Sequence, residues 1–361
     1  MGSDPTTELD WSLGSRAASL ADWDAALTSG RLVAGAGPKV TPDERAALRA
    51  DLASAVDDAE GLIAERTGLE VTGFRSRAWV MGRGGWIRQN IGGLQRLMEP
   101  LADRILERRG SGRELPAATR KVLAWQVGGL LGYVSRRVLG QFDIFVPPDD
   151  DGLIYFVGPN LIDVERTFAL SPRDFRMWVA IHEVTHRVQF SVAPWLRSEI
   201  RGVVDKYLDT VSLDAKEMLD QLSAALEGLR GGPDDAPGGI LRMLTPEQRP
   251  LFEQTQAMMS LLEGHASYVM NLVAADVVDD LPTLRAALAK RRAVGGLEKR
   301  LQHAIGFDQK VAQYDVGERF VAHVVERAGM SGFNLVWQGP ANLPRPDEIG
   351  DPDRWIARVT G

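Results

Sequence analysis

Apolar residues recur at helical spacing along most of this chain. Between Thr41 and Thr67 they stand four or seven positions apart, and Thr41 is followed by a proline and two acidic residues, a pattern typical of a capped helix start. The same analysis predicts further helices at residues 79–106, 117–138, 171–190, 198–229, 251–278, 284–291 and 307–327. The chain is therefore expected to be mainly α-helical.

Two short apolar runs depart from this pattern. Residues 142–146 and 153–157 flank a segment of prolines, aspartates and a glycine at 147–152, which predicts a β-hairpin. Residues 1–40 are rich in small residues and glycine, and we interpret them as an N-terminal extension packed loosely on a body formed by residues 41–361. The expected fold class is mainly α (α+β), with a small β-hairpin or sheet preceding the helix at 171–190.

Composition narrows the possible classes of function. A chain of 361 residues with 44% hydrophobic content can bury a substantial core. Its net charge of −7 offers no general basic surface, so no nucleic-acid partner is expected. The first residues lack a basic start and an apolar signal core, and no run reaches the roughly 20 apolar residues that span a bilayer. The sequence predicts a soluble cytoplasmic protein with no membrane partner.

The strongest chemical signal lies in the helix predicted at residues 171–190. His182, Glu183 and His186 stand in the order H-E-x-x-H, which places two imidazoles one turn apart on one helix face. Imidazole nitrogens bind zinc at about 2.0–2.1 Å, and zinc lowers the pKa of a bound water to about 7. Glu183 can then serve as the general base. The alternative interpretation is a pair of ordinary core histidines.

A zinc site needs a third protein ligand. The chain has no cysteine, so a histidine, glutamate or aspartate must provide it. Gln189 and Val192 occupy the positions where the extended metzincin pattern requires glycine and histidine, which excludes that subclass. Two candidates, Glu263 and His265, lie within Leu261–Tyr268 of the helix predicted at 251–278.

Glu263 and His265 cannot both face one ion on a regular helix. Two positions correspond to about 200° around the helix axis, so one residue must have another role unless the helix is distorted at Gly264. An isolated buried carboxylate costs more free energy than a neutral imidazole, and it has the greater need of a cation. This argument favours Glu263 as the ligand and leaves His265 as the alternative.

Several of these segments resemble known metallopeptidases. Leu261–Tyr268 is similar to the E-G-x-A-x-Y segment of many gluzincin peptidases, in which the glutamate is the third zinc ligand. Most of the chain resembles a family of zincin-like hydrolases of actinobacteria. Some members of this family are labelled as associated with the biosynthesis of a deazaflavin coenzyme. The landmarks of this resemblance are Leu131–Tyr133, Val138–Asp143, Val157–Asn160, His182–His186, and Gln313 and Tyr314 with Gly317 and Phe320.

The resemblance implies a zincin-like metalloprotease fold and a zinc cofactor held by His182, His186 and Glu263. It implies hydrolysis of a peptide or amide substrate, with zinc polarising the carbonyl while Glu183 activates water and then protonates the leaving amine. It also implies that one strand of the predicted hairpin lies along an extended peptide substrate. A hairpin that only covers the core is the alternative.

Two further residues enter the hypothesis as catalytic groups. His265 or the hydroxyl of Tyr314 would steady the intermediate if it lay near the metal, whereas core packing is the other interpretation of Tyr314. A second class of function also stays open, in which the chain is a non-catalytic zincin-fold binding or scaffold protein linked to deazaflavin coenzyme metabolism. Glu183 favours an enzyme, because a purely structural zinc requires ligands but no base.

Overall fold

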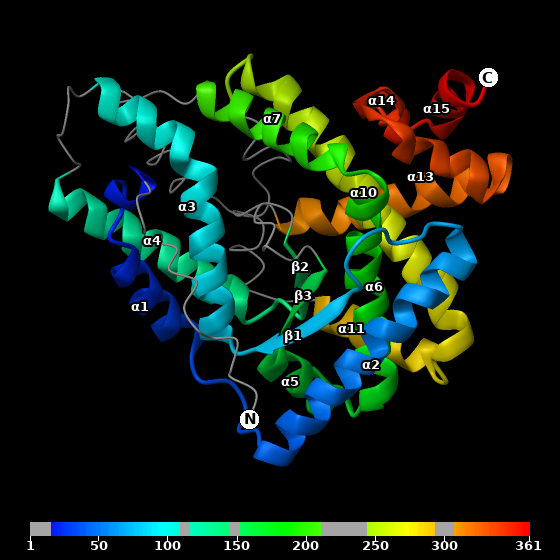
Figure 1. Ribbon diagram of the computed structural model, residues 1–361, viewed down its shortest axis with the longest axis horizontal. Helices are drawn as coiled ribbons and strands as arrows, with labels where there is room; N and C mark the ends of the chain where they lie inside the picture. The colour runs from blue at the N-terminus through cyan, green and yellow to red at the C-terminus, as the bar shows by residue number, and fades with distance from the viewer. Residues whose placement is uncertain (1–15, 109–115, 144–151, 211–243, 293–306) are drawn as a thin grey trace.

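The computed structural model describes residues 16–108, 116–143, 152–210, 244–292 and 307–361 (Figure 1). Helices make up most of these residues and surround a small sheet, which confirms the mainly α class. The helices are α1 (Trp23–Ala34), α2 (Pro42–Thr67), α3 (Arg83–Arg108), α4 (Ala117–Ser135), α5 (Gly158–Phe168), α6 (Pro172–Val192), α7 (Trp195–Asp209), α10 (Gln248–Val277), α11 (Leu281–Arg292), α13 (Phe307–Phe333), α14 (Pro346–Ile349) and α15 (Pro352–Val359). Short 3-10 helices are η1 (Arg16–Ser19), η2 (Asn334–Gln338) and η3 (Pro340–Asn342).

The start of α2 shows how local sequence determines these elements. The Thr41 hydroxyl accepts the backbone N–H of Glu44, and the Glu44 carboxylate accepts the backbone N–H of Thr41. This reciprocal capping box satisfies N–H groups that the first helical turn leaves without partners. The helix then ends at Gly68, which adopts the left-handed conformation with φ of 70°.

The sheet has three strands in the order β1-β3-β2. β1 (Arg77–Met81) runs parallel to β3 (Leu153–Val157), with Arg77 opposite Leu153. β2 (Gly140–Phe142) runs antiparallel on the other side of β3, with Phe142 opposite Ile154. β2 therefore forms one edge of the sheet.

The start of the helix predicted at residues 79–106 is wrong. Residues Arg77–Met81 form β1, and α3 begins only at Arg83. The partner of β1 is β3, which lies more than seventy residues further along the chain. A parallel pairing of this kind cannot be predicted from the local spacing of apolar residues, because a long connection separates the two strands in the sequence.

The predicted hairpin is confirmed in its pairing and shifted in its bounds. Its first strand begins at Gly140 and ends at Phe142, earlier than predicted, while the second strand matches Leu153–Val157. Residues 144–151, including the predicted turn, lie outside the described residues. The same holds for 211–243, and thus for most of the helix predicted at 198–229.

Within the described residues, buried apolar side chains form one large core and two smaller ones. The large core joins α2, the sheet, α6, α10 and α13, and α6 passes through it between α2 and α10 (Figure 1). One of the smaller cores fills the space between α1, α3 and α4, and the other packs η1 against α3. Because α6 is central, groups on it are held by packing from several sides.

The described part of residues 1–40 packs more closely than the sequence suggests. A Cβ added at Gly128 of α4 would lie 2.1 Å from the Ala26 carbonyl oxygen of α1, so these two helices touch backbone to backbone. The expected loose packing does not hold for α1, while a domain boundary near residue 40 stays a prediction. No helix within the described ranges is long and apolar enough to cross a membrane.

Candidate metal centre

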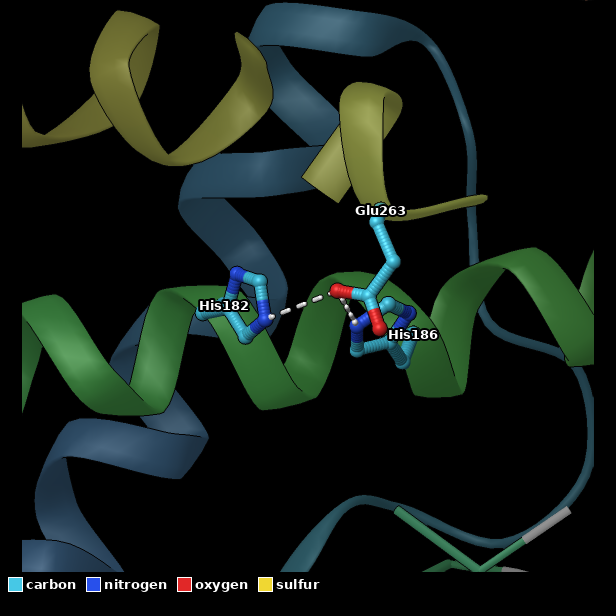
Figure 2. Close-up of side chains that lie close together, drawn as sticks. All are labelled: His182, His186 and Glu263. Atoms are coloured by element: carbon cyan, nitrogen blue, oxygen red, sulfur yellow. Dashed lines mark ion pairs between the residues drawn. The ribbon is translucent and has the colours of Figure 1, made fainter. Parts of the chain in front are cut away.

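The two histidines of the H-E-x-x-H motif project from the middle of α6. The helix begins with Ser171 as its N-cap and Pro172 in its first turn, as predicted. This start lies two to three turns before the motif and determines which face of the helix carries the two histidines. His182 and His186 stand one turn apart, and their ring centroids are 4.8 Å from each other. Both rings turn toward the same neighbouring helix (Figure 2).

That neighbouring helix is α10, which brings Glu263 to the two histidines. The Oε2 atom of Glu263 lies 3.7 Å from Nε2 of His182 and 3.6 Å from Nε2 of His186 (Figure 2). All three side chains are well shielded from solvent, with Glu263 buried. The three residues predicted as ligands therefore meet, although α6 and α10 lie far apart in the sequence.

The donor set fits a zinc ion. Ligands at about 2.0–2.1 Å in a tetrahedron lie about 3.3 Å from one another. The separations of 3.6 and 3.7 Å are close to this value and longer than an ordinary hydrogen bond. Two imidazoles and one carboxylate are also the ligand type of many catalytic zinc sites.

His186 and Glu263 are also coupled electrostatically. Burial by itself lowers the pKa of His186, but the negative charge of the nearby Glu263 carboxylate favours the protonated ring, and the pKa is raised above its ordinary value. The carboxylate thus stabilises a positive charge at this position. A divalent cation would gain from the same interaction.

Gly264 explains how Glu263 comes to its place. A Cβ added at Gly264 would lie 2.1 Å from the carbonyl carbon of Gly317, and one at Gly317 would lie 1.8 Å from the Ser260 carbonyl oxygen. α10 and α13 therefore cross with their backbones in contact at this point. The glycine next to the ligand permits this crossing, and α10 remains a continuous helix without the distortion considered from the sequence.

His265 lies away from the metal ligands. Its side chain is fully buried, stacked on Phe333 at 5.2 Å between ring centroids and set edge-on against Trp337. Burial, together with the charge of His186, lowers the pKa of His265 to about 3. The structure places Glu263, and not His265, beside the histidine pair.

Glu183 lies between the metal ligands and the edge of the sheet. Its Oε2 accepts the backbone N–H of Phe142 at 3.2 Å, and the side chain is buried. Gly140 lets β2 approach this closely, since a Cβ there would lie 2.5 Å from Cγ of Glu183. The sheet edge therefore holds the predicted base, a contact that the sequence did not reveal.

Gln189 is a residue of the site that sequence reasoning missed. Its amide connects Nδ1 of His186 with the backbone of α10 and with His265. In the sequence alone, Gln189 only excludes the metzincin pattern. A polar residue three places after a ligand histidine, between the apolar Val188 and Phe190, is the signal that could have identified it.

Tyr314 cannot be placed against the metal ligands. Its backbone belongs to α13, about one turn before Gly317 at the crossing with α10. Its side chain lies outside the described residues, so its catalytic role stays a prediction. Within the described ranges, His182, His186 and Glu263 are the group of potential metal ligands that converges.

An H-E-x-x-H helix that meets a glutamate from a second helix is the arrangement expected of a zincin with two histidine ligands and one glutamate ligand. The chain matches the zincin-like metallopeptidase family over residues 21–356, and it belongs to that family. Membership of a zincin-like family, which the motifs predicted, is thus confirmed. The link to deazaflavin metabolism stays a prediction.

One solved structure is similar to this chain over nearly its whole length. A protein from Chloroflexus aurantiacus, described as a "putative hydrolase with a novel fold", shares 31% sequence identity with this chain. The match covers 94% of this chain and 99% of the other, with a TM-score of 0.69. No protein of curated function matches the chain significantly.

Proposed function

We propose that this protein is a zinc-dependent hydrolase that cleaves a peptide or amide bond. The observation that carries the proposal is the convergence of His182, His186 and Glu263 beside Glu183. The separations between the ligand atoms suit one zinc ion, and Glu183 is not needed as a ligand. A carboxylate in this place is what a general base requires.

The residues divide the chemistry between them. Zinc held by the three ligands would supply a Lewis acid and lower the pKa of a water molecule to about 7. Glu183 takes a proton from the attacking water and delivers it to the leaving amine. The backbone N–H of Phe142 donates a hydrogen bond to one carboxylate oxygen of Glu183, which orients the carboxylate for proton transfer.

The sheet edge limits how a substrate can bind. β2 is an edge strand, and an extended peptide adding to it would use its outward-facing backbone groups. The N–H of Phe142 is already bonded to Glu183, so it is not one of those groups. We infer that an extended substrate pairs with other backbone groups of this strand.

Replacing Glu183 by glutamine tests the proposal. Glu183→Gln keeps the size of the side chain and leaves all three ligands in place, so zinc content should not change. Turnover of a fluorogenic peptide library should fall by about 10²–10⁴-fold, the usual contribution of a general base. Glu318→Gln is the control, because Glu318 accepts a hydrogen bond from Asn271 on α10 and is not part of the cluster.

Two results would contradict the proposal. Turnover in Glu183→Gln equal to the parent would remove Glu183 from the mechanism. Stoichiometric zinc with no turnover of any peptide or amide in the parent would instead support a non-catalytic zincin-fold scaffold.

A further inference from the structure

The side-chain amide of Gln189 has only one possible orientation. Nε2 of Gln189 lies 2.8 Å from the carbonyl oxygen of Leu262, and a carbonyl oxygen can only accept a hydrogen bond. If the amide were reversed, two oxygen atoms would face each other. The nitrogen therefore faces α10, and the amide oxygen faces the other way.

This orientation determines which nitrogen of His186 carries a proton. Oε1 of Gln189 lies 3.0 Å from Nδ1 of His186, and an amide oxygen accepts, so Nδ1 must donate. In a neutral imidazole the proton on Nδ1 leaves a lone pair on Nε2. Nε2 is the atom that faces Glu263. The hydrogen bond to Gln189 thus selects the tautomer that a metal needs.

His265 completes the arrangement from the far side. Its Nδ1 lies 3.0 Å from Nε2 of Gln189, so it accepts the second N–H of the amide. Its Nε2 is buried and has no hydrogen-bond partner in the described part of the chain. Such a nitrogen costs free energy that a phenylalanine at this place would avoid, so packing alone does not account for a histidine here.

We propose that Gln189 and His265 are positioning residues for the metal centre: Gln189 holds His186 in the Nδ1–H tautomer with Nε2 toward the metal, and His265 holds the Gln189 amide. Because Leu262 precedes Glu263, the same amide also ties α6 to the backbone beside the third ligand. This inference rests on the metal site of the proposed function and assigns no group to direct contact with substrate.

Metal affinity tests the role of Gln189. The zinc dissociation constant is measured by competition with a chromophoric chelator for the parent, Gln189→Leu and Gln189→Glu. Gln189→Leu removes the acceptor for Nδ1–H and should raise the dissociation constant by about 10–100-fold, as for other partners of ligand histidines. Gln189→Glu keeps an acceptor and should stay within about threefold of the parent.

Thermal unfolding of the metal-free proteins separates positioning from a purely structural role. Gln189→Glu loses both N–H donors, to Leu262 and to His265, so it should be destabilised at least as much as Gln189→Leu. A structural role would make zinc affinity follow stability in both variants. Thr185→Val is the control, since Thr185 is buried beside His186 on α6 and its hydroxyl bonds the Ile181 carbonyl.

A cobalt-substituted site adds a readout that does not depend on activity. The visible spectrum of Co²⁺ reports ligand geometry, and its bands should shift in Gln189→Leu but not in Thr185→Val. His265→Phe keeps the stacking on Phe333 and removes the acceptor for Gln189. It should shift the same bands in the same direction, with a smaller loss of zinc affinity.

The outcomes distinguish this inference from the proposed function. If the parent binds zinc and Gln189→Leu binds it within about twofold, the positioning role of Gln189 is wrong while the metal site stands. If Gln189→Leu differs from the parent but His265→Phe has the zinc affinity and the Co²⁺ spectrum of the parent, the positioning role of His265 is wrong. If the parent binds no zinc or cobalt, the proposed function itself fails.

Discussion

Specific contacts hold the side chains of Glu183 and His186 and the backbone beside Glu263 at the candidate metal centre. The Phe142 N–H fixes Glu183, the Gln189 amide fixes His186, and the glycine after Glu263 lets α13 press against α10 at that point. Contacts of this kind reduce the freedom of groups that must act together, which is the requirement for an organised active site.

The buried His265 predicts a particular dependence of stability on pH. Burial lowers the pKa of His265 to about 3 in the folded chain, whereas an exposed histidine has a pKa of 6.5. Below pH 6.5 the unfolded chain therefore takes up a proton at this residue that the folded chain does not. The stability of the parent should therefore fall on acidification. Between pH 7 and pH 4 this one group should cost about 3 kcal/mol.

The pH dependence of stability is compared between the parent and His265→Phe. Both proteins are kept in chelator so that bound zinc does not contribute to the free energy of unfolding. The free energy of unfolding is measured with urea at each pH. The parent should lose more stability than the variant over this range, because all other titrating groups are shared. Equal losses would show that His265 is protonated in the folded protein.

Gly140 predicts an effect on chemistry without an effect on metal binding. A Cβ in Gly140→Ala would displace Glu183 from its present position, so turnover should fall by at least about tenfold while zinc content stays at the parent value. Gly82→Ala is the matched control, since nothing lies within 4 Å of a Cβ at that position. Unchanged turnover in Gly140→Ala would mean that the close approach of β2 does not matter.

At the scale of the elements, local patterns were sufficient for helices and not for strands. α2 and α6 carry their own start signals in Thr41 and Ser171, and both begin where predicted. β1 was predicted as the start of a helix because its partner β3 is remote in sequence. Long-range pairing is a property of the folded chain, and one sequence shows little of it.

The candidate site was predictable to a similar extent. The ligands on α6 follow from one motif, and the preference for Glu263 over His265 follows from the cost of burying a charge. The contacts of Glu183 with β2 and of Gln189 with His265 depend on how three elements pack together. No spacing within a single helix could reveal them.

The crossing of α10 and α13 predicts a large effect on stability. Gly264→Ala would place a methyl group against backbone atoms of Gly317, which cannot move aside as a side chain would. The free energy of unfolding should fall by about 3 kcal/mol or more, at the upper end of overpacking. Gly61→Ala, inside α2 with open space around it, should instead stabilise by about 0.5–1 kcal/mol.

Urea unfolding of both glycine variants measures these changes. A loss below about 1 kcal/mol in Gly264→Ala would show that the two helices can separate at little cost. Zinc content of the same variant then tests whether the crossing is needed to bring Glu263 to α6.

For the whole molecule, the metal centre joins helices that meet only when the chain has folded. α6 lies in the middle of the large core, and α10 packs on it while contacting α13 on another side. A site built in this way has closely packed walls, and its candidate ligands come from distant parts of the sequence. The membership of the chain in the zincin-like metallopeptidase family agrees with this arrangement.

The most direct test of the account is zinc content per chain in untagged protein purified without chelator. We measure it by elemental analysis for the parent, Glu263→Ala and His265→Phe prepared identically. The account predicts about one zinc per chain in the parent and in His265→Phe, and almost none in Glu263→Ala. A parent without zinc, or a Glu263→Ala variant with as much zinc as the parent, would contradict the assignment of His182, His186 and Glu263 as the metal ligands.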